Sequence, residues 1–267
     1  MSKQRLDQLV FSKGLCESRQ KAQQLIMAGE VFVNGQRVDK PGTNVDTEAE
    51  IEIKGDVCPF VSRGGYKLDK AMKVFPIDLQ GKVCMDVGAS TGGFTDCMLQ
   101  NGAKKVYCID VGYGQLAWKL RTDERVVNYE RTNIRNLTKD KVPDKIDFIS
   151  IDVSFISLKL VLPVLKDFMD ENTSVVALIK PQFEAGKGQV GKNGVVREKE
   201  IHLSVINGIL DFCREIELPV SGLDFSPVKG PKGNIEFLLY INKNENETNA
   251  IQVVDAAHQS LNGGDKE

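Results

Sequence analysis

Short apolar runs alternate with longer amphipathic stretches along this chain from about residue 80 onward. The apolar runs, which predict strands, are residues 83–87, 106–110, 126–129, 146–153, 174–179, 220–225 and 237–241. The amphipathic stretches, which predict helices, lie around residues 94–99, 115–120, 156–168 and 199–216. This alternation is typical of a doubly wound, Rossmann-like α/β fold, in which helices cover both faces of a mostly parallel sheet. The connector between the last two runs is too short for a crossover helix, so we expect the last strand to be antiparallel.

The first 54 residues follow a different pattern and are expected to form a small, separate α+β domain. Two amphipathic stretches, over residues 2–14 and 18–29, predict helices that begin at a capping serine and end at a glycine. Their inward-facing residues are Leu6, Leu9, Val10, Ala22, Leu25 and Ile26. An alternating stretch over residues 31–38 surrounds an Asn-Gly pair and predicts a hairpin. Further short strands are expected at Val45 and at residues 51–53.

Composition along the chain predicts where the domains end. Residues 55–61 combine a flexible glycine with a stiff proline and are expected to be a linker. The α/β domain is expected over residues 62–245, and a tail over residues 246–267. The polar residues 242–249 are expected to be a loose surface segment, and the amphipathic residues 251–261 predict a short helix in the tail.

Overall composition excludes several classes of protein. The chain has 267 residues, of which 41% are hydrophobic and 27% charged, and its formal net charge is -2 at pH 7. Because the chain is not basic overall, RNA binding would depend on local patches. The 6 cysteines form no C-x-x-C pair, which predicts core thiols in a reducing compartment and no disulfide framework or metal site. No signal peptide or apolar stretch of membrane-spanning length is visible, so we expect a cytoplasmic protein without membrane contact, and we expect a monomer.

The most informative segment is the glycine-rich turn after the first predicted strand of the α/β domain. Its glycines allow the backbone to approach a ligand closely, and a helix begins directly after them. The spacing differs from G-x-G-x-x-G and from the P-loop, so neither a dinucleotide nor a triphosphate is the first expectation. The predicted cofactor-binding residues of this segment are Asp86, Gly88, Ser90, Thr91, Gly92, Gly93 and Phe94. A plain chain reversal is the alternative.

Two more polar residues follow the next two predicted strands. Asp110 ends its strand, where a carboxylate suits both hydroxyls of a ribose, although acids at this position also serve NAD enzymes. Asn133 follows the third strand and suits an adenine edge, with a plain surface role as the alternative. Because ligands bind at the carboxyl ends of parallel strands, both residues are predicted to bind the cofactor.

Four ionisable residues stand where solvent-side charge is not expected: Lys67 ahead of the first strand, Asp152 and Lys180 at strand ends, and Glu236 at a strand start. Together they resemble the Lys-Asp-Lys-Glu tetrad of FtsJ-type ribose 2′-O-methyltransferases. A ribose hydroxyl needs a base at neutral pH. Lys180 suits this role, because apolar neighbours and the cation at Lys67 disfavour its ammonium form. We expect Asp152 to orient Lys180 beside the cofactor's methyl group, and Lys67 and Glu236 to position the ribose.

The N-terminal segment resembles the small RNA-binding domain named after the fourth small-subunit ribosomal protein. The resemblance rests on Arg5-Leu6-Asp7, Gly14-Leu15, Ser18-Arg19 and Val33-Asn34-Gly35. It implies that basic side chains contact RNA phosphates, and the candidates are Lys3, Arg5, Arg19 and Lys21. A solvated charged helix face is the alternative.

The tetrad, the turn and the N-terminal module together resemble the TlyA family of rRNA 2′-O-methyltransferases, which is also labelled hemolysin A. Further matching motifs are Ser62-Arg63-Gly64-Gly65, Asp110-Val111-Gly112-Tyr113-Gly114-Gln115-Leu116, Ser154-Phe155-Ile156-Ser157-Leu158, Lys180-Pro181-Gln182-Phe183-Glu184 and Gly188-Gln189-Val190-Gly191. The resemblance implies S-adenosylmethionine as the cofactor and ribosomal RNA or ribosomal subunits as the partner. It also implies methylation of a cytidine ribose.

The glycine-rich loop over residues 182–197 carries Lys187, Lys192 and Arg197. We expect a mobile lip over the active site that contacts RNA phosphates, because loops of this length are often functional. A plain surface loop is the alternative.

Three other functions stay open at this point. A membrane-active hemolysin would need an apolar or strongly amphipathic insertion segment, and none is visible in the sequence. An RNA-binding ribosome-assembly factor without catalysis is disfavoured by the intact tetrad. An NAD-dependent oxidoreductase is disfavoured by the missing G-x-G-x-x-G motif.

Overall fold

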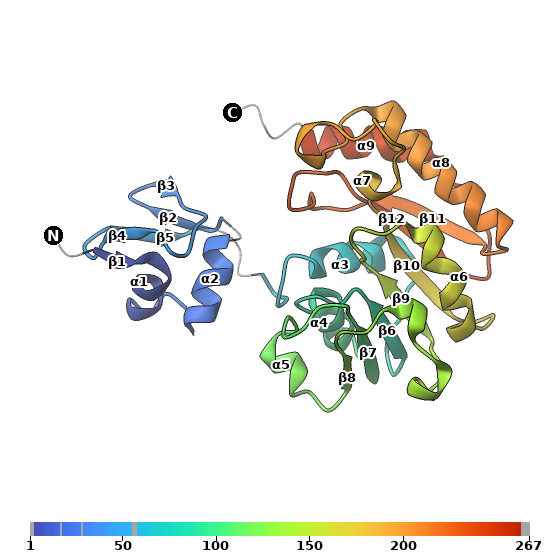
Figure 1. The fold of residues 1–267 in the computed structure, drawn as a ribbon, viewed down its shortest axis with the longest axis horizontal. Coiled ribbons are helices and arrows are strands. Elements are labelled where there is room, and N and C mark those ends of the chain that lie inside the picture. The colour runs from blue at the N-terminus through green and yellow to red at the C-terminus, as the bar shows by residue number, and fades with distance from the viewer. Residues whose placement is uncertain (1–2, 17, 28, 55–57, 263–267) are drawn as a thin grey trace. The chain divides into compact units, whose positions relative to one another are not determined.

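A computed structural model of the chain describes residues 3–16, 18–27, 29–54 and 58–262. The chain forms two compact units, Met1–Pro59 and Phe60–Glu267, each with its own core (Figure 1). We describe each unit by itself.

The N-terminal unit contains two helices and two small sheets. Its elements are β1 (Lys3–Arg5), α1 (Leu6–Ser12), α2 (Arg19–Met27), β2 (Val31–Val33), β3 (Gln36–Arg37), β4 (Asn44–Asp46) and β5 (Ile51–Ile53). Strand β2 lies between β3 and β5, and β1 pairs with β4. The apolar residues predicted to face inward are buried against these sheets.

Local signals placed most of these elements correctly. The predicted hairpin is present, and its turn residues Asn34 and Gly35 have φ angles of 50° and 76°, as a two-residue hairpin turn requires. Ser18 caps the second helix, because its Oγ accepts a hydrogen bond of 3.1 Å from the backbone N–H of Lys21. The start of the first helix was wrong: residues 3–5 form a strand paired with β4, so α1 begins only at Leu6. Ser2, the expected cap, lies outside the described residues.

The larger unit is built on a seven-stranded sheet with the order β11-β12-β10-β9-β6-β7-β8. Its strands are β6 (Val83–Val87), β7 (Lys105–Ile109), β8 (Val126–Tyr129), β9 (Phe148–Ile151), β10 (Ser174–Ile179), β11 (Val220–Phe225) and β12 (Phe237–Ile241). Strands β10, β9, β6, β7 and β8 are parallel, whereas β12 is antiparallel to both β10 and β11. The predicted fold class, including the antiparallel last strand, is therefore confirmed.

Helices cover this sheet (Figure 1). They are α3 (Gly65–Val74), α4 (Gly93–Gln100), α5 (Trp118–Arg121), α6 (Leu162–Leu165), α7 (Pro181–Glu184), α8 (Lys199–Glu215) and α9 (Ala250–Asn262). The apolar pattern did not predict α3. The helix predicted over residues 156–168 is divided into shorter pieces. Ser157 caps a short 3₁₀ turn, and α6 begins separately with Pro163 in its first turn.

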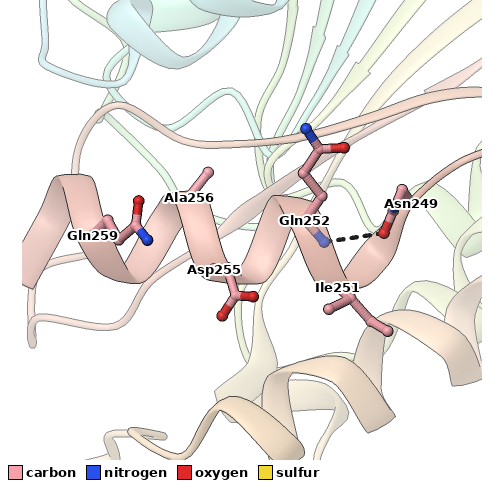
Figure 2. Close-up of a pocket in the computed structure, with 6 residues that line it drawn as sticks. All are labelled: Asn249, Ile251, Gln252, Asp255, Ala256 and Gln259. Carbon is pink, nitrogen blue, oxygen red and sulfur yellow. Dashed lines mark hydrogen bonds between the residues drawn. The ribbon is translucent and has the colours of Figure 1, made fainter.

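The C-terminal segment packs on the larger unit. Asn246 bonds to β11 through its N–H to Val220 O (3.0 Å) and its Nδ2 to Ser221 O (3.0 Å), so residues 242–249 are less loose than expected. The stretch 251–261 lies in α9, where Asn249 Oδ1 accepts the Gln252 N–H at 3.0 Å (Figure 2). The inner face of α9 is part of the main core, and its outer face lines the shallow pocket of Figure 2.

The chain's 2 histidines join α9 to α8. His202 Nδ1 lies 2.9 Å from His258 Nε2, and His202 is fully buried. Burial, together with the positive charge that His258 gains on protonation, lowers the pKa of His202 to about 4. Burial and the charge of Lys199 also lower the pKa of His258.

This pair gives a prediction for acid titration. Because the pKa of His202 is depressed when the chain is folded, the unfolded chain binds more protons between about pH 4 and pH 6.5. The contribution of His202 to stability is therefore complete above pH 6.5 and is lost as the pH falls toward 4. We expect NMR to show that the His202 imidazole is still neutral at pH 5.5. Titration of both rings near their ordinary pKa would contradict the buried pair.

Candidate functional site

The glycine turn between β6 and α4 depends on glycine for steric reasons. Gly88 has a φ of +87°, and a Cβ at this position would lie 2.6 Å from the Asp152 carbonyl oxygen. A Cβ at Gly93 would lie 2.4 Å from Ser62 Oγ and 2.8 Å from Gly65 N. The turn therefore packs directly against the end of β9 and the start of α3, which leaves room for only a bare backbone.

Asp86 holds the start of this turn. Its Oδ2 accepts hydrogen bonds from the Thr95 N–H (3.0 Å) and hydroxyl (2.7 Å), and its Oδ1 accepts one from Ser150 Oγ (3.0 Å). Complete burial raises the pKa of this carboxyl to about 6 despite these bonds. Asp86 thus connects β6 to α4 through its bonds to Thr95.

A cavity of about 190 Å³ opens beside the turn. It is lined by Lys67, Asp152, Lys180 and Glu236, and by Asp86, Gly88, Ser90, Thr91, Gly93 and Phe94 of the turn. The structure therefore brings all four tetrad residues and most of the predicted cofactor-binding residues to one place. Gly92, Asp110 and Asn133 are not part of this lining.

Asp110 and Asn133 make local bonds instead. Asp110 accepts the Ser90 N–H at 2.7 Å and the Gly112 N–H at 2.6 Å, so it ties the glycine turn to the end of β7. Asn133 Oδ1 accepts the Arg135 N–H at 3.0 Å and caps a short 3₁₀ turn. Contacts of these two residues with a nucleoside stay predictions.

The tetrad converges because the antiparallel β12 starts where the parallel strands end. Asp152 follows β9 and Lys180 follows β10, while Glu236 precedes β12, in which Phe237 pairs with Ile179. Lys67 comes from α3 and lies between two carboxylates, with Nζ 2.6 Å from Glu236 Oε2 and 3.3 Å from Asp152 Oδ2. Lys180 Nζ lies 2.5 Å from Asp152 Oδ1.

The charges of the tetrad balance in a buried setting. Burial opposes the charge of Lys67, but Asp152 and Glu236 outweigh it and raise the pKa of this lysine. Burial likewise opposes the charge of Asp152, but Lys67 and Lys180 outweigh it and lower the pKa of the carboxyl. The sequence placed the two lysines side by side as repelling cations. The structure instead places Asp152 between them, so this part of the expectation is corrected.

Ser154 in the cavity and its neighbour Phe155 had no role assigned from the sequence. Ser154 lines the cavity, and its Oγ accepts a hydrogen bond of 3.0 Å from Lys180 Nζ. Phe155 is 88% exposed, has a φ of +63°, and its ring centroid lies 5.0 Å from that of Phe183. A left-handed backbone conformation costs a bulky residue conformational free energy, so the backbone at Phe155 is strained. The available signal was an aromatic residue just beyond the strand end that carries Asp152.

The basic candidates lie in two regions. Lys3, Arg5 and Arg19 are exposed in the N-terminal unit, and Lys21 is half-buried. In the loop over residues 182–197, Lys187 and Arg197 are exposed, and the side chain of Lys192 lies outside the described atoms.

This loop is bonded at both ends, although we expected a mobile lip. The Glu184 carboxylate accepts hydrogen bonds from Ser157 Oγ (2.6 Å) and the Leu158 N–H (2.7 Å). Near the other end, Asn234 accepts the Val196 N–H at 3.0 Å and donates to Gly194 O at 2.9 Å.

The fold and the site can now be compared with known protein families. Residues 60–243 match the FtsJ-like methyltransferase family, and residues 4–51 match the S4 domain. The chain belongs to the FtsJ-like methyltransferase family. In this methyltransferase the S4 domain forms most of the N-terminal unit, which confirms the resemblance seen in that segment.

Relatives of this FtsJ-like methyltransferase carry two kinds of name. The 16S/23S rRNA (cytidine-2′-O)-methyltransferase TlyA of Mycobacterium tuberculosis is 42% identical and covers 97% of this chain and 98% of its own length. Hemolysin A of Brachyspira hyodysenteriae is 43% identical over 88% of this chain and 98% of its own length. A solved Streptococcus thermophilus structure, also named for hemolysin, has a TM-score of 0.79 and 46% identity, with 100% of both chains covered. The resemblance to the TlyA family is confirmed. Among the residues that the structure describes, no helix has both the length and the apolar character to cross a membrane.

Proposed function

We propose that this methyltransferase moves a methyl group from S-adenosylmethionine to the ribose 2′-hydroxyl of a cytidine in ribosomal RNA. The observation that carries the proposal is the position of Lys180, a lysine with a side chain only 9% exposed, in the same cavity as the glycine turn. The rRNA and the cytidine are suggested by the relatives' names.

The residues around the cavity fit this cofactor. S-adenosylmethionine supplies an electrophilic methyl group on a positively charged sulfur. The carboxylates of Asp86 and Asp152 in the wall suit that charge, and the bare backbone at Gly88 permits close approach. Asp110 would hold the ribose hydroxyls of the nucleoside, and Asn133 its adenine edge.

The oxygen atoms around Lys180 Nζ would orient this amine as a general base. A neutral amine has two N–H donors and one lone pair. Ser154 Oγ accepts a hydrogen bond from Lys180 Nζ at 3.0 Å, and Asp152 Oδ1 lies 2.5 Å from the same nitrogen as its ion-pair partner. With these two oxygens on the N–H side of the amine, its lone pair would face an incoming hydroxyl. After proton transfer, the ammonium pairs with Asp152, which is held by Lys67, and Lys67 in turn pairs with Glu236. Lys180 is the general base in this proposal, and Asp152 and Ser154 orient it.

Product analysis tests the proposal. Ribosomal RNA transcribed in vitro, and therefore unmodified, is incubated with the protein and methyl-labelled S-adenosylmethionine, then digested to nucleosides. We expect the label in 2′-O-methylcytidine. A matched transcript with 2′-fluorocytidine, which lacks the acceptor hydroxyl, should stay unlabelled. Label on a base, or no label at all, would contradict the proposal.

Phe155 gives a prediction for RNA recognition. An exposed ring one residue after Ser154 suits stacking with a nucleobase of the target, and such stacking contributes about 1–3 kcal/mol. Phe155→Ala should therefore lower kcat/KM for RNA roughly 5- to 150-fold and leave cofactor affinity unchanged. Phe155→Tyr, which keeps the ring, should retain most activity. Equal kcat/KM for the alanine variant and the wild type would exclude the stacking role.

A further inference from the structure

Asp7 is a fully buried acid in the small N-terminal unit, and two arginines share it. We propose that Asp7 is a positioning residue that fixes Arg5 and Arg19 as one phosphate-binding site for RNA. This inference rests on the proposed function, because it assumes that the N-terminal unit binds ribosomal RNA.

Both oxygens of the Asp7 carboxylate accept hydrogen bonds. Arg5 contacts both oxygens, with Nε 3.0 Å from Oδ1 and Nη2 3.1 Å from Oδ2. Arg19 adds Nε at 3.1 Å and Nη2 at 3.0 Å from Oδ2, and Gln23 Nε2 lies 2.8 Å from the same oxygen. The backbone N–H of Gln8 completes the set at 3.0 Å from Oδ1. Two guanidinium groups are thus fixed to one anion.

Exposure separates the buried anion from the two cations. The side chain of Asp7 is 0% exposed, whereas those of Arg5 and Arg19 are 45% and 47% exposed. Each guanidinium turns Nε and Nη2 toward Asp7, so among the contacts of the described residues Nη1 is the group that Asp7 does not use. Gly42 lets the Arg5 guanidinium pack close to the backbone, because a Cβ at Gly42 would lie 3.3 Å from Arg5 Nη1.

The charge of this cluster suits a phosphate. Two arginines and one aspartate leave a net charge of +1, and the positive part is the part that faces solvent. Hydrogen bonds from Arg5, followed by those from Gln23 and Arg19, outweigh burial and hold the pKa of Asp7 far below its usual range, so the carboxylate stays charged. Without it, two adjacent guanidinium groups would repel each other and separate. Guanidinium groups held in a fixed direction bind phosphate oxygens better than mobile ones do.

The test compares two substitutions that change net charge equally. Asp7→Asn and the control Asp39→Asn, at an exposed acid of the same unit, each remove one negative charge. Charge alone would tighten RNA binding in both variants. We expect Asp7→Asn to weaken binding of the full chain to purified large-subunit ribosomal RNA at least about fivefold, with a salt slope smaller by about 1. The control should bind at least as tightly as wild type.

Two outcomes separate this inference from the proposed function. If wild type neither binds nor methylates ribosomal RNA, the proposed function fails. If wild type binds and a folded Asp7→Asn variant binds equally or more tightly, the positioning role is overturned. Should that variant unfold, Arg5→Lys/Arg19→Lys decides, because it keeps Asp7 and both charges but loses the guanidinium geometry. We expect a several-fold loss of affinity, and unchanged affinity would overturn the inference.

Discussion

Lys180→Ala is expected to slow methyl transfer by about 10³-fold or more under single-turnover conditions, because the hydroxyl then loses its proton acceptor. Affinity for S-adenosylmethionine should change only a few-fold. The fold should persist, since Asp152 keeps its ion pair with Lys67 at 3.3 Å after the substitution. Quench-flow measurement of labelled RNA gives the rate, and equilibrium titration gives the affinity.

Lys180→Arg is the matched control for this prediction. Arginine keeps the positive charge beside Asp152 but does not lose a proton in proteins, so it cannot serve as a base. We expect this variant to be as slow as the alanine variant. A Lys180→Arg enzyme with near-normal rate would show that the site needs charge at this position and that the proton goes elsewhere.

Lys67→Met is expected to have the largest effect on stability. It leaves Glu236, whose side chain is only 1% exposed, without the ammonium that now lies 2.6 Å away. Breaking one side of a buried ion pair costs about 3–5 kcal/mol, because the remaining charge is left in an apolar setting. Urea unfolding should therefore show the free energy of unfolding reduced by about that amount.

Two further variants isolate the cause of this loss. Lys73→Met, on the same helix α3, removes a lysine whose side chain is 71% exposed and paired with Asp69. It should cost less than about 1 kcal/mol. Lys67→Met/Glu236→Gln removes both charges of the buried pair and should recover part of the loss. A Lys67→Met variant as stable as Lys73→Met would contradict the buried pair.

The sequence located most elements of both units, apart from β1 and α3. Apolar runs located the strands of the sheet, and the Asn34-Gly35 pair located the hairpin, because both signals depend on residues close together in the chain. The tetrad could be named because Asp152 and Lys180 are charged residues directly after apolar strands, where charged side chains are uncommon.

What the sequence missed depends on contacts between distant residues. The glycine-rich start of α3 hid the helix that carries Lys67. Asp152 lies between the two lysines because Lys67 comes from α3 while Lys180 follows β10, and no periodicity shows how two side chains approach each other. No role was assigned to Asp7 from the sequence. Its burial, and its sharing by Arg5 and Arg19, appear only once α1 and α2 pack together.

The central claim is that the amine of Lys180 takes the hydroxyl proton, and chemical rescue of Lys180→Ala tests it most directly. The substitution removes the side chain beside a cavity of about 190 Å³, which leaves space for a small amine. Added methylamine or ethylamine should restore methyl transfer in proportion to the concentration of the unprotonated amine, so rescue should increase with pH. Equal rescue by tetramethylammonium, which carries the charge but cannot accept a proton, would contradict the account.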